Sequence, residues 1–474
     1  MKKMCRICLL ITTFLLLVSF SVPAMAVNTV AVGPHVTNGC LTLDAKEALS
    51  GTEQLLDTAK AAILYELENE TMVYAWNPDA QVDPSGMNKL MTALLALELA
   101  DPQEIVTVTR SALDSVAIGS VSAGLKRWEE ISLHDLLYCM MVGSANDAAA
   151  VIAEHIGSTQ EQFVQMMNDR AAELGCTNTC FMNPTGLPVQ GQYTSARDLA
   201  RITAAALENE LFVEMFCAVN YTVPATNKAA ERYVVTTNYL TSKETVKSQY
   251  DARVTGGKTG ALSTTDRSLI STAEYGGKRY LAIVMSAQGT VTADGLSVKT
   301  FGSFEETRVL LDHGFNDFSV RQVLQSGQVL AQYDVENGEN AVVCGPSQTL
   351  DVTLPKNISP EKVTYRCVLN QDQIKAPLQA GTVLGSAEVW YDGICVGRAD
   401  LVAMEDVYVA GEHISALQPI APPESDEVLQ NWLLIGGLVV LGAGVVTALV
   451  LLILRLVRKH QLDRRHKLIN GGRP

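Results

Sequence analysis

A long apolar segment near the C-terminus constrains where the rest of the chain can fold. Residues 432–454 are 23 consecutive residues without a charge, which is long enough to cross a bilayer as one helix. Acidic residues precede this segment and seven Lys and Arg residues follow it, so the positive-inside bias places residues 455–474 in the cytoplasm. We therefore expect a transmembrane anchor at 432–454, with every preceding residue outside the membrane.

The N-terminus has the pattern of a secretory signal. Residues 1–26 combine a basic start, an apolar run at 7–22 and a small-x-small cleavage site that ends at Ala26. An uncleaved anchor is the alternative. We expect an exported protein with a leader of small and polar residues at 27–57.

The exported part is acidic. The whole chain carries a net charge of −15, and without the +3 of the signal and the +6 of the tail the remainder carries −24. This charge disfavours nucleic acid and teichoic acid as non-specific partners, and is compatible with a cationic or zwitterionic substrate.

The cysteines of the exported part are too few for a disulfide scaffold. Cys176 and Cys180 are near enough in the sequence to pair, but their spacing does not match a zinc site. We expect buried thiols here, and the sequence implies no metal and no organic cofactor.

Hydrophobic periodicity indicates a mixed α/β domain followed by a β-domain. Residues 60–76 alternate as a β-hairpin with its turn near Asn69, and 279–289 read as a buried strand. Residues 133–157 predict helix, turn and helix, and 159–175 predict an amphipathic helix that ends at Gly175.

A change in pattern after residue 318 predicts the domain organisation. Residues 58–318 form the first domain, and 319–412 form a small all-β domain with hairpin signals at Asn337-Gly338 and Asp392-Gly393. A proline-containing stretch at 413–431 predicts a stiff linker to the anchor.

Three separated motifs contain the residue types that acyl transfer by a serine requires. They are the predicted helix around Lys89, "SAND" at 144–147, and "GGKTGA" at 256–261. Such chemistry needs a base beside a hydroxyl, a group that relays the proton, and donors for the oxyanion. Each motif alone is weak, since Ser144 and Asn146 also suit a helix cap and Lys258 also suits a solvated surface.

The order of these motifs and the sequences around them resemble one family. "NKLMTALLALE", "GSANDAAAVIAEHI", "FMNPTGLPVQGQYTSARDLARI" and "LLDHGF" are similar to D-alanyl-D-alanine carboxypeptidases, the low-molecular-mass penicillin-binding proteins, over residues 61–318. The resemblance implies an antiparallel sheet with helices on one face and a helical lobe beside it. It also implies removal of the terminal D-alanine of peptidoglycan stem peptides through an acyl-serine that β-lactams mimic.

The resemblance assigns a role to each motif residue. Lys89 is the general base, Ser144 relays the proton, and Asn146 steadies the lysine and the substrate amide. Lys258, Thr259 and Gly260 hold the terminal carboxylate, and the backbone N–H of Ala261 contributes to the oxyanion hole.

The chain departs from the family at the nucleophile. Where the family has Pro-Ala-Ser-x-Thr-Lys, residues 84–89 read PSGMNK, so Gly86 stands at the position of the serine. On an ideal helix Ser85 shares a face with Lys89, but its hydroxyl is displaced by about 100° around the axis and ~1.5 Å along it. A misplacement of about 1 Å costs roughly a hundredfold in rate. Ser85 is thus the candidate nucleophile, and a helix N-cap is the alternative.

Other departures fall in the same predicted pocket. Ala261 stands where the family has Tyr or His, Thr265-Asp266 replace an Ala-Gly pair, and Ser303 replaces an arginine that helps to bind the carboxylate. Lys299 is a hypothetical substitute for that arginine. The clustering of these changes favours a loss of chemistry.

The sequence therefore predicts an α/β (α+β) penicillin-recognising domain, a small all-β domain and one transmembrane helix. We expect a membrane-anchored D-alanyl-D-alanine carboxypeptidase that acts on stem peptides and binds β-lactams at the outer side of a bacterial membrane. The alternatives are an inactive relative that binds stem peptides or a cell-wall partner, and a β-lactamase. The preferred peptide, the role of the β-domain and the oligomeric state stay open.

Overall fold

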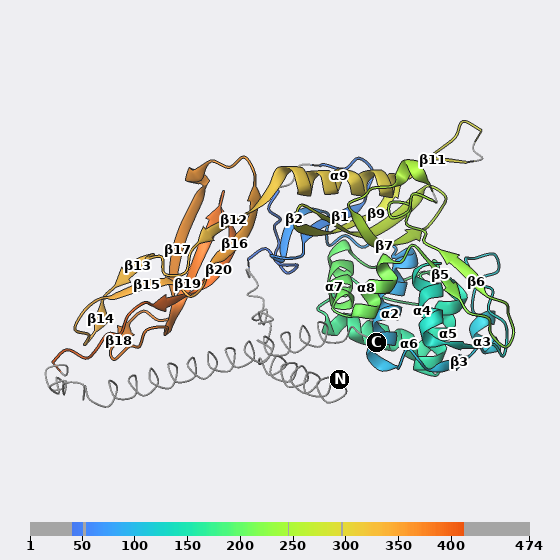
Figure 1. The fold of residues 1–474 in the computed structure, drawn as a ribbon, viewed down its shortest axis with the longest axis horizontal. Coiled ribbons are helices and arrows are strands. Elements are labelled where there is room, and N and C mark those ends of the chain that lie inside the picture. The colour runs from blue at the N-terminus through green and yellow to red at the C-terminus, as the bar shows by residue number, and fades with distance from the viewer. Residues whose placement is uncertain (1–39, 51–53, 245, 295–296, 412–474) are drawn as a thin grey trace, which may run out of the picture. The chain divides into compact units, whose positions relative to one another are not determined.

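The computed structural model describes residues 40–50, 54–244, 246–294 and 297–411 (Figure 1). The predicted signal, linker, anchor and tail lie outside these ranges. No helix in the described part of the chain has the length and apolar character that a membrane span needs.

A five-stranded antiparallel sheet forms the centre of the first domain, in the order β2-β1-β9-β8-β7. Its strands are β1 (Ala61–Glu66), β2 (Thr71–Trp76), β7 (Val254–Ala261), β8 (Asp266–Tyr275) and β9 (Lys278–Gln288). The predicted hairpin at 60–76 and the predicted strand at 279–289 are confirmed. Strand β7 is an edge strand, so one side of its backbone is free to pair with another chain.

Helices cover both faces of this sheet (Figure 1). Ala61, Ile63 and Tyr65 of β1 belong to the core shared with the helical lobe, whereas Ala62 and Leu64 belong to the core that contains α9 (Gly302–Asp317). Successive residues of a strand point to opposite faces, so both faces of β1 are buried, each in a different core. We expected helices on one face and a helical lobe beside the sheet; α9 covers one face, and the lobe packs on the other face.

The helical lobe is built around a buried helix. Residues 88–96 of α2 are all buried, which is the pattern of a helix packed on every side. The predicted helices at 133–157 and 159–175 are confirmed, and Gly175 adopts a left-handed φ of 74° just after the second. The helices of the lobe are α2 (Asn88–Leu99), α3 (Arg110–Asp114), α4 (Leu133–Met141), α5 (Asn146–Gly157), α6 (Gln160–Glu173), α7 (Ala196–Leu207) and α8 (Glu210–Cys217). Short elements complete the domain: β3 (Ile105–Thr107), β4 (Glu130–Ser132), β5 (Asn220–Val223), β6 (Arg232–Val235), β10 (Thr290–Val291), β11 (Val298–Thr300), η1 (Ser85–Met87) and η2 (Lys247–Gln249).

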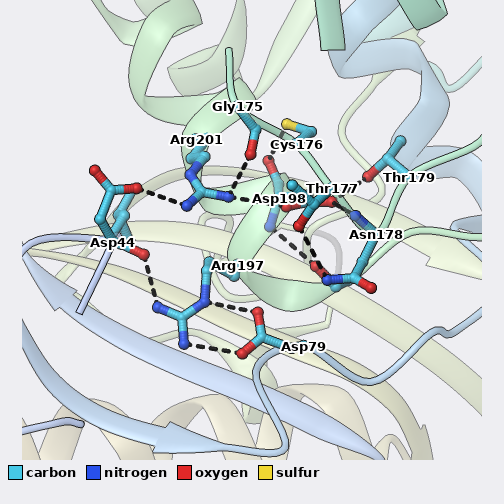
Figure 2. A network of polar contacts seen from close by, with 12 residues as sticks. Asp44, Asp79, Gly175, Cys176, Thr177, Asn178, Thr179, Arg197, Asp198 and Arg201 are labelled. Carbon is cyan, nitrogen blue, oxygen red and sulfur yellow. Dashed lines mark hydrogen bonds and ion pairs between the residues drawn. The ribbon is translucent and has the colours of Figure 1, made fainter. Parts of the chain in front are cut away.

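Charged residues at the start of α7 join segments that are distant in the sequence (Figure 2). The buried Arg197 guanidinium donates to both carboxylate oxygens of Asp79, at 2.7 and 3.0 Å, and to the carbonyl oxygen of Leu43 at 2.6 Å. Asp198 accepts from the backbone N–H of Asn178 at 2.7 Å and from the hydroxyl of Thr179 at 2.8 Å. These bonds fix the turn that leads into the loop at 183–188.

The second domain contains only strands and one short 3-10 helix among its described residues. Asp392-Gly393 joins β19 to its partner β20 and is confirmed as a hairpin turn, whereas Asn337-Gly338 lies in a longer connection between the paired strands β13 and β15. The connection at Asn337-Gly338 still joins two antiparallel strands, and it is longer because β14 lies within it and pairs with β18. The elements are β12 (Phe318–Leu324), β13 (Ala331–Tyr333), β14 (Val335–Glu336), β15 (Val342–Pro346), β16 (Leu350–Pro355), η3 (Pro360–Lys362), β17 (Val363–Leu369), β18 (Ile374–Lys375), β19 (Val383–Tyr391) and β20 (Ile394–Ala403).

The eight cysteines of the described ranges comprise six free thiols and one disulfide. Cys176 is a buried free thiol, as expected, whereas Cys180 is a free thiol that is only partly buried. A disulfide that the sequence analysis missed joins Cys40 to Cys395, which are 355 residues apart.

Candidate active site

The three sequence motifs meet in one cavity of about 370 Å³. The start of α2, the turn between α4 and α5, the loop at 183–188 and the end of edge strand β7 surround it. Its lining residues are Gly86, Lys89, Gly119, Ser120, Val121, Ser144, Asn146, Thr185, Gly186, Leu187, Pro188, Thr237, Tyr239, Thr259, Gly260, Ala261 and Arg267.

Lys89 lies at the bottom of this cavity and is 1% exposed. Its Nζ donates to Asn146 Oδ1 at 2.7 Å and to the carbonyl oxygen of Thr185. Burial, and then the nearby charge of Lys258, hold the pKa of Lys89 well below its ordinary value. A neutral amine that donates two hydrogen bonds keeps one lone pair, so Lys89 is suited to accept a proton.

Lys258 and Ser144 form a second polar pair beside Lys89. Lys258 Nζ donates to Ser144 Oγ at 2.8 Å and to the carbonyl oxygen of Thr259 at 3.0 Å, and burial lowers the pKa of Lys258 to about 7. The alternative of a solvated surface lysine is wrong. The helix-cap alternative is also wrong, because the N-cap of α5 is Ala145 and no side chain caps this helix.

Residue 86 faces the cavity, and residue 85 does not. A Cβ added to Gly86 would lie 3.8 Å from Ser144 Oγ and 3.0 Å from the carbonyl oxygen of Thr259. Ser85 does not line the cavity, and its buried Oγ has no hydrogen-bond partner within the described ranges. The Ser85 hydroxyl instead packs against Gly260, where an added Cβ would fall 2.0 Å from it. The structure thus brings Lys89, Ser144, Asn146 and β7 together around Gly86.

The backbone explains this placement. Ser85 has a left-handed φ of 47°, and α2 itself begins only at Asn88, after the 3-10 turn η1. A non-glycine residue in this conformation costs about 1–3 kcal/mol, and such strain is found most often at functional sites. The helix-cap alternative for Ser85 is wrong, since neither η1 nor α2 has a side-chain cap.

The loop at 183–188 is a part of the site that sequence reasoning did not assign. Gly186 has a φ of 78°, and an added Cβ would lie 1.5 Å from the carbonyl oxygen of Ser85, so only glycine fits against this segment. Asn88 reaches the same loop, because its Nδ2 donates to the carbonyl oxygen of Asn183 at 2.7 Å. The sequence "NPTGL" at 183–187 could have identified this loop as part of the site, but it served only as evidence for the family resemblance.

Asp147 is a second support that was not assigned. Its carboxylate accepts from Ser122 Oγ at 2.6 Å and from the backbone N–H groups of Ala123 and Leu125, at 2.8 and 3.0 Å. These bonds hold the segment that places Gly119, Ser120 and Val121 at the rim of the cavity. Asp147 is the fourth residue of the "SAND" motif, so the motif itself was the sequence signal that could have identified it.

The cationic residue at the rim is Arg267 of β8, which sequence reasoning also missed. Neither Lys299 nor Ser303 is among the lining residues, and Ser303 is buried on α9. Among the described residues, no group of His, Cys, Asp and Glu side chains is arranged to hold a metal ion.

Comparisons with known proteins agree with this geometry. Residues 50–289 match the model of the D-alanyl-D-alanine carboxypeptidase family, and residues 318–409 match the C-terminal domain of penicillin-binding protein 5. The chain therefore belongs to the D-alanyl-D-alanine carboxypeptidase family, the low-molecular-mass penicillin-binding proteins.

Individual relatives span most of the chain. The D-alanyl-D-alanine carboxypeptidase DacF of Bacillus subtilis (strain 168) is 27% identical, over 81% of this chain and 95% of its own. DacA of Haemophilus influenzae is 30% identical, over 75% of this chain and 86% of its own. The crystal structure of penicillin-binding protein 5 from Haemophilus influenzae superposes with a TM-score of 0.59 at 28% identity, over 76% of this chain and all of that one.

Proposed function

We propose that this protein acts on peptidoglycan stem peptides as a penicillin-binding protein of the D-alanyl-D-alanine carboxypeptidase type. The observation that carries the proposal is the meeting of Lys89, Asn146, Ser144 and Lys258 beside the free edge of β7. An extended peptide can add to that edge by main-chain hydrogen bonds, which places its terminal residues in the cavity.

The two lysines divide the proton transfers of such a reaction. Neutral Lys89 takes the proton of a serine hydroxyl as its oxygen adds to the carbonyl carbon of the penultimate D-alanine. Ser144, which accepts a hydrogen bond from Lys258 Nζ, passes its proton to the departing amine of the terminal D-alanine as the carbon–nitrogen bond breaks, and it recovers a proton from protonated Lys89. An acyl-serine remains, and water hydrolyses it. Ser85 carries the hydroxyl of η1, and to react it must turn out of its buried position.

A second function, stem-peptide binding without turnover, is favoured by one observation. The cavity presents the backbone of Gly86 where the reacting hydroxyl belongs, while the buried Ser85 hydroxyl packs against Gly260 of β7. Recognition through β7 and the two lysines does not require that hydroxyl. The relatives matched above lend no support to the third interpretation, a β-lactamase.

We also propose that the protein is exported and anchored in the membrane by residues 432–454, with its C-terminal tail in the cytoplasm. The charge pattern at both ends supports this topology, and a disulfide between Cys40 and Cys395 is typical of an oxidising compartment outside the cytoplasm. Removal of residues 432–474 should release the protein from the membrane fraction, and continued pelleting with membranes would count against the anchor.

Covalent labelling separates the two functions. The full-length protein in detergent is exposed to a fluorescent penicillin and analysed by intact mass, with Ser85→Ala as the paired variant. Labelling that disappears in Ser85→Ala establishes Ser85 as the nucleophile. No labelling, with measurable binding of a peptide that ends in D-Ala-D-Ala, establishes a binding relative. Absence of both labelling and peptide binding contradicts the proposal.

A further inference from the structure

We propose that a second cavity, separate from the candidate active site, is a binding site for primary alkylammonium groups. It has a volume of about 460 Å³, lies where α7 and α8 pack against the sheet, and shares no lining residue with the first cavity. Thr255 at the start of β7 lines it, whereas Thr259 and Ala261 at the end of β7 line the candidate active site. At about 3.3 Å per residue, these two ends of β7 are about 20 Å apart, so the inference does not depend on the proposed function.

Three carboxylates of this second cavity are not neutralised. Glu70, Glu208 and Glu274 line it, and within the described ranges none of their carboxylates takes part in an ion pair or a side-chain hydrogen bond. Arg279 also lines the cavity, but its guanidinium pairs with Glu68, which is not a lining residue. The cavity therefore has an uncompensated negative charge, which favours a cationic ligand.

A buried phenol lines the same cavity. Tyr65 is only 6% exposed, and its hydroxyl makes no hydrogen bond to any residue that the structure describes. Burial, and then the carboxylates of Glu70 and Glu66, raise the pKa of Tyr65, so the hydroxyl stays protonated. Buried hydroxyls normally have a hydrogen-bond partner, so this one marks a place for a polar atom of a ligand.

The end of α7 adds to the negative potential. Ala204 and Leu207 near the end of α7, and its C-cap Glu208, line the cavity, and the last turn of this helix contains no basic residue. The C-terminus of a helix has a partial negative charge that favours a cation within the last turn. The helix, the carboxylates and the phenol thus favour the same kind of ligand.

These features suit an organic ammonium better than a metal ion. In the described part of the chain, no His, Cys, Asp and Glu side chains are grouped so that they can hold a metal. Apolar side chains, among them Leu67, Leu207 and Val213, complete the lining and match an alkyl stem. An ammonium group has three N–H donors, which the Tyr65 oxygen and the carboxylates can accept. A free amine and the lysine side chain of a peptide both present this group.

The test compares amines with their neutral analogues, by calorimetry on the full-length protein in detergent. Pentylamine is paired with pentanol, and Nα-acetyl-lysine N-methylamide is paired with its Nε-acetyl derivative. The charge variant combines Glu208→Gln with Glu274→Gln, and its matched control combines Glu161→Gln with Glu305→Gln. The control residues are exposed carboxylates in the first turns of α6 and α9 that do not line the cavity, so both variants change the net charge equally.

We expect at least one of the amines to bind roughly tenfold or more tightly than its neutral analogue, because its hydrogen bonds are charge-assisted. The charge variant should weaken that binding about fivefold, and the control should keep the parental affinity. Tyr65→Phe removes only the hydroxyl and should weaken it about threefold. Tighter binding of pentylamine identifies a free amine as the ligand, and tighter binding of the lysine derivative identifies a peptide side chain.

Four results overturn the inference. The first is that neither amine binds, and the second is that charged and neutral forms bind equally. The third is equal weakening in the charge variant and in its control, because the overall negative charge of the protein would then explain the binding. The fourth is parental affinity in both the charge variant and Tyr65→Phe. None of these results bears on penicillin labelling, which tests the other cavity.

Discussion

The two halves of the pocket differ in whether they contain the side chains that acyl transfer requires. In the acid–base half, Lys89, Lys258, Ser144 and Asn146 are buried or half-buried and joined by hydrogen bonds of 2.7–2.8 Å. In the nucleophile segment, the residue that faces them is Gly86, and the neighbouring serine is turned away. Each buried lysine reduces stability, because its amine is removed from water. The comparison teaches that the groups suited to proton transfer are assembled in this cavity, whereas the position that faces them has no side-chain hydroxyl.

The largest expected effect comes from restoring a hydroxyl at position 86. In Gly86→Ser, the new Cβ lies 3.8 Å from Ser144 Oγ, and the carbonyl of Thr259, at 3.0 Å, must yield by a few tenths of an ångström. A hydroxyl correctly placed beside Lys89 should raise the rate of acylation by penicillin at least about a hundredfold. The measurement is the rate of covalent labelling by intact mass.

The matched control for that experiment is the double variant Gly86→Ser with Lys89→Met, which lacks the base and should lose the gain. A folded Gly86→Ser protein that binds peptide but gains no labelling would show that the acid–base half cannot activate a hydroxyl. The two halves would then not differ in their capacity for catalysis.

The second largest effect concerns the support of the nucleophile segment. In Gly186→Ala, a methyl group would overlap the carbonyl of Ser85, at 1.5 Å, in a backbone conformation with φ of 78°. Strain and overlap together should lower the free energy of unfolding by about 3 kcal/mol. Chemical denaturation measures this, with Gly191→Ala as control, since Gly191 also has a positive φ but has open space around it. Equal losses in the two variants would mean that the close packing against Ser85 contributes nothing.

The third prediction is a pH dependence of stability that originates in the acid–base half. The pKa of Lys258 is about 7 in the fold and 10.5 as its ordinary value. Between these values the unfolded chain holds a proton that the folded chain lacks, so the free energy of unfolding rises as the pH increases from about 7 to about 10.5. Below about pH 7 the fold bears the full unfavourable contribution of the buried charge.

Lys258→Met removes this contribution. The rise should become shallower by up to about 1.4 kcal/mol per pH unit, measured by denaturation of both proteins at several pH values. Parallel curves for the two proteins would show that Lys258 titrates normally in the fold.

The smallest expected effect belongs to Ser85. Its hydroxyl is buried without a hydrogen-bond partner in the described part of the chain, so Ser85→Ala should leave stability unchanged or raise it by up to about 1 kcal/mol. Ser144→Ala is the comparison, because it removes the acceptor of Lys258 Nζ and should destabilise by about 1–2 kcal/mol. A marked loss of stability in Ser85→Ala would reveal a bond that holds this hydroxyl.

Local pattern predicted the secondary structure well, because each element depends on its own residues. The hairpin at 60–76, the helices at 133–157 and 159–175 and strand β9 follow from periodicities of 2 and 3.6. The order of the motifs also predicted that Lys89, Ser144, Asn146 and Lys258 belong to one site. The face calculation for Ser85 did not apply, because it assumed a continuous helix from residue 85, whereas Ser85 is left-handed and α2 starts at Asn88.

What the sequence could not predict depends on tertiary contacts. Arg267 and Thr237 enter the cavity because of strand register and loop packing, and no local pattern marks them as neighbours of Lys89. The same holds for the longer connection around Asn337-Gly338, which contains β14 because that strand pairs with β18.

The Cys40–Cys395 disulfide closes a covalent ring that contains the sheet, the helical lobe and the whole cavity. A protease that cuts once anywhere between these two cysteines opens the ring but releases no fragment. With the anchor proposed at residues 432–454, which follows Cys395, both products of such a cut would stay attached to the cell. In every case, fragments of the two domains would separate on a gel only after reduction.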